Sequence, residues 1–103
     1  MIITYSKNNV PIRITKERWG HITRRHPELK NQREKVVETI SNPDFIQDGD
    51  LGELIAGHFF SGTPLTQKYL IAAYKEISDQ DEFIITAYFT NAPLSRRTMI
   101  WKR

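Results

Sequence analysis

After a short extended segment at the start of the chain, the hydrophobic positions change from helical to strand spacing near residues 42–43. Before that point the spacing is helical and predicts a first helix from residue 15 to about residue 26, and a second from about residue 29 to residue 41. Thr15 is expected to be the N-cap of the first helix, and Pro27 is expected to end it. The chain therefore begins with a largely helical half.

After residues 42–43 the hydrophobic positions follow the two-residue period of β-strands. We expect four strands, at residues 53–60, 68–77, 82–90 and 97–102. Short connections at residues 61–64 and 78–81 are typical of antiparallel hairpins. Residues 45–46 predict only a brief extended piece. A short strand at residues 10–14, with residues 2–5 as its possible partner, precedes the helices.

This order of elements predicts an α+β fold in one domain over residues 1–103. The N-terminal helices would pack on one face of a roughly four-stranded antiparallel sheet. The strand over residues 83–90 alternates most clearly. Its odd positions predict an apolar face under the helices: Phe83, Ile85, Ala87 and Phe89. Its even positions become polar toward the end of the strand, in the order Ile84, Thr86, Tyr88 and Thr90. This second face can bind a phosphate or a base, although such residues are also good strand formers.

Composition excludes several classes of site and location. The chain has no cysteine, so disulfides, thiolate metal sites and cysteine nucleophiles are excluded. No segment approaches the roughly 20 apolar residues of a membrane span, and the first residues do not resemble a secretory signal. We therefore expect a soluble, cytoplasmic protein without a membrane partner.

Charge is unevenly distributed along the chain. Residues 1–47 hold nine Lys/Arg and five Asp/Glu, residues 48–90 hold two and seven, and residues 91–103 hold four and none. The segments thus carry +4, −5 and +4. If the helices meet the C-terminal strand in space, one basic surface forms that suits RNA. Two solvated helices and a basic tail are the alternative.

The first predicted helix contains the closest grouping of side chains that could transfer protons or bind phosphate. Residues 19–28 read WGHITRRHPE, with two imidazoles, two guanidiniums, an indole and a carboxylate. One helical face holds Trp19, Ile22, Thr23 and His26, and the other holds Glu17, His21, Arg24 and Arg25. Histidine exchanges protons near neutral pH and arginine clamps phosphate, so the pattern favours a phosphodiester-cleaving or phosphate-binding site. A solvated helix with a capping histidine is the alternative.

This run resembles the small phage- and toxin-associated nuclease-like proteins of the barnase–EndoU–colicin–RelE (BECR) superfamily. The resemblance extends to Asn-Pro-Asp at residues 42–44, Thr-Ala-Tyr-Phe-Thr at residues 86–90 and Arg-Arg-Thr-Met-Ile-Trp at residues 96–101. It implies the BECR (RelE-like) fold and a metal-independent endoribonuclease, often the toxin of a toxin–antitoxin pair. RNA would be the substrate, and an antitoxin or other protein a possible partner. Active-site residues differ between branches, so the resemblance implies a location: the open sheet face and the adjoining helix edge.

Metal-independent RNA cleavage uses the substrate 2′-OH as nucleophile and needs a general base, a general acid and cations. The candidate catalytic residues are His21, Arg25, His26, Tyr88 and Thr90. The candidate residues for binding RNA or phosphate are Arg24, Lys68, Thr86, Arg96 and Arg97. We expect no cofactor. We also expect no metal, because His21 and His26 are five residues apart and point away from each other on a helix. The carboxylates at residues 48–53 are expected to form a solvated turn.

Two other functions fit the same sequence. A non-catalytic RNA- or protein-binding module on this fold would tolerate His→Gln changes, whereas catalysis would not. A small antitoxin or immunity-type protein would need a large apolar or acidic surface, which the acidic residues 48–53 and 79–82 could supply. Some candidates also have structural explanations. His26 can cap a helix, Trp19 and Trp101 can belong to the core, and Lys68 can protect a sheet edge.

Overall fold

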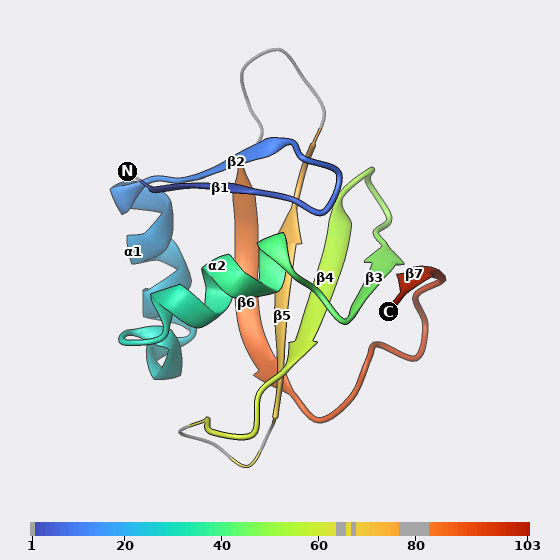
Figure 1. Ribbon diagram of the computed structural model, residues 1–103. Coiled ribbons are helices and arrows are strands. Elements are labelled where there is room, and N and C mark those ends of the chain that lie inside the picture. Colours follow the sequence, from blue (N-terminus) through green and yellow to red (C-terminus); the bar gives the residue numbers. More distant parts are fainter. Residues whose placement is uncertain (1, 64–65, 67, 77–82) are drawn as a thin grey trace.

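The computed structural model describes residues 2–63, 66, 68–76 and 83–103. In chain order these residues form β1 (Ile2–Tyr5), β2 (Pro11–Ile14), α1 (Lys16–Arg25), the 3₁₀-helix η1 (Pro27–Leu29), α2 (Arg33–Ser41), β3 (Phe45–Asp48), β4 (Leu54–Phe59), β5 (Tyr69–Tyr74), β6 (Ile84–Thr90) and β7 (Met99–Lys102) (Figure 1). Every strand pair is antiparallel. The predicted α+β class is therefore confirmed.

The main sheet has five strands in the order β6-β5-β4-β3-β7, one more than predicted. The additional strand is β3, which lies between β4 and β7. Its first three residues, Phe45, Ile46 and Gln47, are all buried, so β3 lacks the alternation that reveals a half-exposed strand. β1 and β2 form a separate hairpin, as expected. Parts of two predicted turns and of two predicted strands lie outside the described residues. They are residue 64 at the end of the first turn, residue 77 at the end of a strand, the turn at residues 78–81 and residue 82 at the start of the next strand.

Helix α1 forms as its capping residues predict. The Thr15 side chain accepts a hydrogen bond from the Arg18 backbone N–H at 3.0 Å. The second helix begins four residues later than predicted, because the chain first makes the 3₁₀ turn η1. Leu29 is fully buried in that turn, and its carbonyl accepts the Gln32 N–H at 2.8 Å. Burial of Leu29 thus turns the chain before α2 starts.

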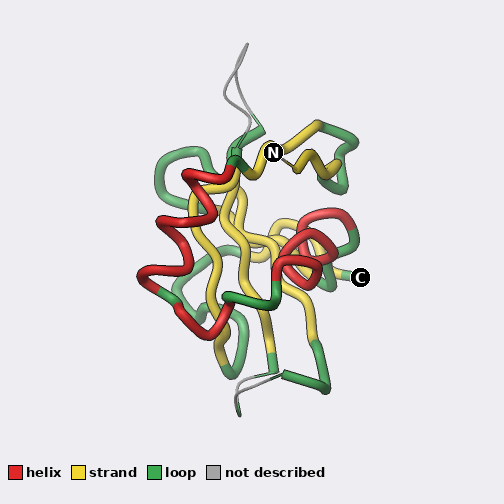
Figure 2. Tube along the Cα trace, turned by 90° about the vertical axis from the view of Figure 1, so that its left-hand side faces the viewer, coloured by secondary structure: helices red, strands yellow, loops and turns green. Residues whose placement is uncertain are grey.

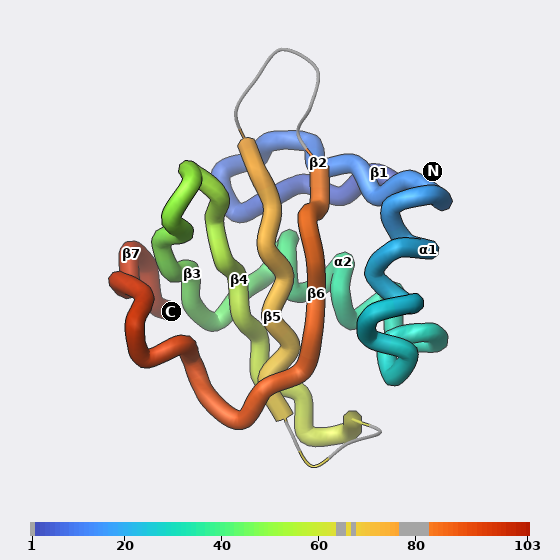
Figure 3. The backbone as a smooth tube through the Cα atoms, turned by 180° about the vertical axis from the view of Figure 1, so that it is seen from behind, coloured from blue at the N-terminus to red at the C-terminus, as the bar shows by residue number. Residues whose placement is uncertain are grey.

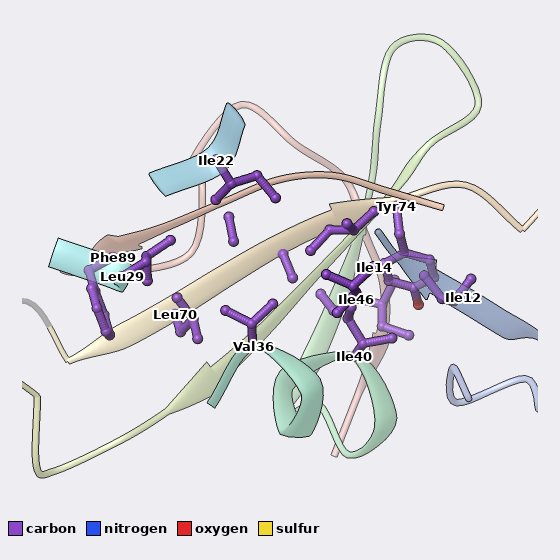
Figure 4. Close-up of a cluster of buried hydrophobic side chains, with 14 residues drawn as sticks. Ile12, Ile14, Ile22, Leu29, Val36, Ile40, Ile46, Leu70, Tyr74 and Phe89 are labelled. Carbon is purple, nitrogen blue, oxygen red and sulfur yellow. The ribbon is translucent and has the colours of Figure 1, made fainter. Parts of the chain in front are cut away.

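The two helices take different positions on the sheet. Helix α2 packs across the front of β4 and β5, whereas α1 runs beside the edge strand β6 (Figures 1 and 2). The main core lies between α2, the β1–β2 hairpin and the front of the sheet (Figure 4). It includes Ile12, Ile14, Ile22, Leu29, Val36, Ile40, Ile46, Leu70, Tyr74 and Phe89. Ile22 is the buried anchor of α1 in this core.

No helix in the described part of the chain crosses the back of β4, β5 and β6 (Figure 3). A second, smaller apolar cluster lies there, made of Phe45, Ile55, Ile71 and Ala73. The segment between β6 and β7 borders it, because Leu94 packs against the cluster. Buried Gln47 holds this segment by donating to the Leu94 carbonyl at 2.8 Å and accepting the Leu94 N–H at 3.1 Å. Much of the back face therefore stays open beside α1.

The alternation predicted for β6 is correct at one end and wrong at the other. Ala73 pairs with Thr86 but Tyr74 pairs with Ile84, so Ile85 is an extra residue in a β-bulge. Ala87 and Phe89 face the main core as predicted. The bulge places Ile84 in that core and Ile85 against the back cluster, which is the reverse of the predicted arrangement.

We expect Thr15→Ala to lower the free energy of unfolding by about 1 kcal/mol, because the first turn of α1 loses its side-chain cap. Urea unfolding followed by circular dichroism measures this change. Thr15→Ser retains the hydroxyl acceptor and is the matched control. Equal stability of the alanine variant and the native protein would contradict this role of Thr15.

Candidate active site

A groove of about 640 Å³ lies where α1 passes the back-facing side chains of β6. Figure 3 shows these two elements side by side from the open face of the sheet. The lining residues are Arg18, His21, Ile22, Arg25, His26, Ile85, Thr86 and Tyr88. Five of the predicted site residues, from two distant segments, thus line one groove: His21, Arg25, His26, Thr86 and Tyr88.

His21 is exposed at the rim of the groove and is hydrogen-bonded to an arginine. The Arg24 Nη2 atom lies 2.9 Å from His21 Nδ1. Because a guanidinium can only donate, Nδ1 is the acceptor, and the neutral ring carries its proton on Nε2. The predicted partner of His21 was Arg25, four residues on. Arg25 lines the groove, but the direct contact is with Arg24, three residues on.

His26 has two roles, because its backbone ends α1 and its ring lines the groove. It ends α1, where its backbone N–H donates to the Ile22 carbonyl at 2.8 Å. Its ring lines the groove with its centroid 5.7 Å from that of Tyr88. His26 Nδ1 is also 3.8 Å from a Glu28 carboxylate oxygen. An imidazolium at His26 would therefore have an anionic neighbour, whereas His21 has a cationic one.

Tyr88 forms the floor of the groove from the back face of β6. Burial raises the pKa of its phenol, and the Arg97 guanidinium only partly opposes that rise. The hydroxyl therefore keeps its proton well above neutral pH and can donate a hydrogen bond. Thr86 lines the groove two residues earlier on the same face.

Arg18 also lines the groove, although it was not among the predicted site residues. Its guanidinium carbon lies 4.7 Å from the centroid of the Phe83 ring, a cation–π arrangement that orients the side chain. Helical spacing could have found it, since Arg18 precedes His21 by three residues and Arg25 by seven. Arg18 adds a second guanidinium to the lining.

The other predicted site residues do not line this groove. Thr90 pairs with Tyr69 at the end of β6, and Lys68 Nζ donates to the Ser61 carbonyl at 3.0 Å. Arg96 and Arg97 belong to the segment between β6 and β7, and β7 itself lies at the opposite edge of the sheet from β6. Arg97 forms an ion pair with Asp50 at 2.6 Å. The C-terminal strand β7 does not meet α1, because it pairs with β3 rather than with β6, but Arg97 is close enough to Tyr88 to oppose the rise in the pKa of that phenol.

The third histidine, His58, lies on β4, outside the groove lining. Its Nε2 is 3.5 Å from Glu38 and its Nδ1 is 3.4 Å from Asp44, so it links α2 to the start of β3. In residues 48–53 the Glu53 carboxylate accepts the Leu51 N–H at 2.7 Å, and this hydrogen bond contributes most to lowering the pKa of Glu53. Within the described ranges, no three His, Asp or Glu side chains gather as a metal site would require. Independence from metal stays a prediction.

Comparison with known proteins gave no match in a scan of family models, among curated proteins or among solved structures. The resemblance to the BECR superfamily therefore stays a prediction from sequence motifs. None of the helices formed by the described residues is long and apolar enough to cross a membrane.

The raised pKa of Tyr88 predicts a loss of stability at alkaline pH. The folded protein keeps the phenol proton where the unfolded chain loses it, near pH 10, so the free energy of unfolding falls as the pH rises past about 10. Tyr88→Phe should reduce this fall. Urea unfolding of both proteins at about pH 8 and about pH 11 measures it. The same alkaline fall in both proteins would show that Tyr88 does not contribute.

Proposed function

We propose that this protein is a metal-independent endoribonuclease that cleaves single-stranded RNA in the groove between α1 and β6. One observation carries the proposal: two histidines with opposite electrostatic neighbours line a single groove with two arginines and a protonated phenol. The resemblance of residues 19–28 to BECR nucleases supports the same reaction class. RNA is the substrate because its 2′-OH supplies the nucleophile.

His21 is the general base in this mechanism. Arg24 releases His21 Nδ1 and binds a phosphate oxygen instead, which frees the nitrogen lone pair. Nδ1 then takes the proton of the 2′-OH while O2′ forms a bond to phosphorus. In its hydrogen bond with Arg24, His21 Nδ1 acts as the acceptor, which is also the role that a base requires.

His26 is the general acid. Its imidazolium, next to the Glu28 carboxylate, donates a proton to the leaving 5′ oxygen as the P–O5′ bond breaks. The products are a 2′,3′-cyclic phosphate and a free 5′-hydroxyl. Arg18 and Arg25 neutralise the charge that develops on the phosphorane, and Tyr88 donates a hydrogen bond to the substrate.

The same groove would also suit a non-catalytic RNA-binding module. Such a module would keep its function when the histidines are replaced, whereas the nuclease would lose its activity. An antitoxin or immunity-type function has less support. Of its two acidic segments, residues 79–82 lie outside the described residues, and Asp50 in the other is paired with Arg97. A toxin role and an antitoxin partner are implied by the resemblance alone.

We expect His21→Ala to reduce cleavage by about 10²–10⁴-fold, the usual contribution of one general base, and EDTA to leave the native rate unchanged. Cleavage of a fluorophore–quencher oligoribonucleotide measures both. His58→Gln is the matched control, because it changes a histidine outside the groove lining and should retain activity. Ordinary activity of His21→Ala would disprove its role. Absence of cleavage by the native protein on any RNA would favour the binding module.

Arg25→Lys should also reduce cleavage, because lysine retains the charge but cannot contact two phosphate oxygens at once. The rate at saturating substrate should fall more than the affinity if Arg25 acts on the phosphorane. Single-turnover kinetics separate the two. Arg96→Lys, a guanidinium outside the groove lining, is the control for the substitution itself.

A further inference from the structure

The other side of α1 carries a second basic hollow, centred on Trp19. Trp19 packs partly against the main core and lines two adjoining hollows of about 80 and about 400 Å³. Lys16, Lys30 and Arg33 also line these hollows, together with one carboxylate, Glu34. None of the three cations forms an ion pair within the described part of the chain. An aromatic ring among unpaired cations suits a stacked base with phosphates on either side.

Gly20 separates this hollow from the cleavage groove. Successive helical residues are rotated by about 100° about the helix axis. Trp19 therefore faces the hollow, Gly20 lies on the outer side of α1 and His21 faces the groove. A Cβ atom added at Gly20 would have no packing neighbour within 4 Å, so packing does not require glycine there. Glycine destabilises a helix interior relative to alanine. The absence of a side chain at Gly20 leaves a shallow depression in the outer surface of α1.

The distance from the hollow at Trp19 to the cleavage groove is short for a nucleic acid strand. An α-helix with its side chains is about 10 Å across, so a path around α1 spans only a few nucleotides. Arg24, which is exposed, lies on the same outer side and adds a cation beside the path. Positive charge is therefore present at both ends of the path, and on the outer side of α1 Arg24 is accompanied by one exposed carboxylate, Glu17.

We propose that a single-stranded RNA held in the cleavage groove crosses α1 at Gly20 and stacks a base on Trp19. Lys16, Lys30 and Arg33 bind the phosphates that flank this base. The inference rests on the proposed function, because it uses the groove as the starting point of the strand. It assigns the hollow to nucleotides a few positions away from the cleaved bond and predicts that longer substrates bind more tightly than dinucleotides.

Trp19 fluorescence tests this directly. The chain has two tryptophans, so Trp101→Phe leaves Trp19 as the only indole. A DNA oligonucleotide of about ten residues lacks the 2′-OH and cannot be cleaved by this mechanism, and stacking should quench Trp19 saturably. A dinucleotide should not quench it. If Trp101→Phe fails to fold, the native protein and Trp19→Phe are compared instead, and only the native protein should show the oligonucleotide-dependent quenching.

Charge removal gives a second, independent measurement. Lys30→Gln with Arg33→Gln should weaken binding of the long oligonucleotide and make the slope of log affinity against log salt shallower by about 1.4, since each single-strand phosphate contact contributes about 0.7. Cleavage of a dinucleotide should not change. Gly20→Gln should obstruct the path and weaken binding, whereas Gly20→Ala, the matched control, should bind normally.

The outcomes separate this inference from the proposed function. Tight oligonucleotide binding without Trp19 quenching, together with an unchanged salt slope in the double variant, would overturn the inference and leave cleavage in the groove intact. Quenching by the oligonucleotide in a protein whose His21→Ala variant cleaves normally would support the nucleotide site and overturn the mechanism. No binding and no cleavage by the native protein would overturn both.

Discussion

One extra residue in the edge strand β6 determines which of its side chains face the main core and which face the back of the sheet. Because Ile85 has no partner on β5, side chains before and after it alternate in opposite phase. Ile84 can therefore fill the main core while Thr86 and Tyr88, beyond the bulge, face the back. An uninterrupted strand would have to leave Ile84 outside the core or turn Tyr88 into it. The floor of the groove depends on this bulge.

The wall of the groove depends on how α1 is held. Ile22 anchors the helix in the main core, Thr15 caps its start and the His26 backbone caps its end. The helix thus stands beside β6 without covering the back of the sheet (Figure 3). Its basic face meets the half-buried Tyr88 there. Contacts within α1 and its end then give the two histidines different surroundings, a guanidinium for His21 and a carboxylate for His26.

Sequence patterns predicted much of this site because its parts are local. The helix over residues 16–25, its cap and its histidines follow from spacing within one turn or two, and the polar positions of β6 follow from alternation. Arg18 had the same helical spacing but was not among the predicted residues. Lys68, Thr90, Arg96 and Arg97 were included on charge or alternation alone, which do not report distance in space. Pairing with Tyr69 fixes the place of Thr90, and contacts with Gln47 and Asp50 fix that of Arg97.

By itself, the sequence determined the α+β class, the first helix and its caps, the antiparallel hairpins and the candidate histidines and arginines, since each depends on neighbours a few residues away. Only the tertiary structure decided the five-strand order, the bulge at Ile85 and the position of β7 opposite α1. The buried strand β3 shows the reason. A strand enclosed on both faces has no alternating pattern, and its partners are chosen by packing and backbone hydrogen bonds between segments far apart in the chain.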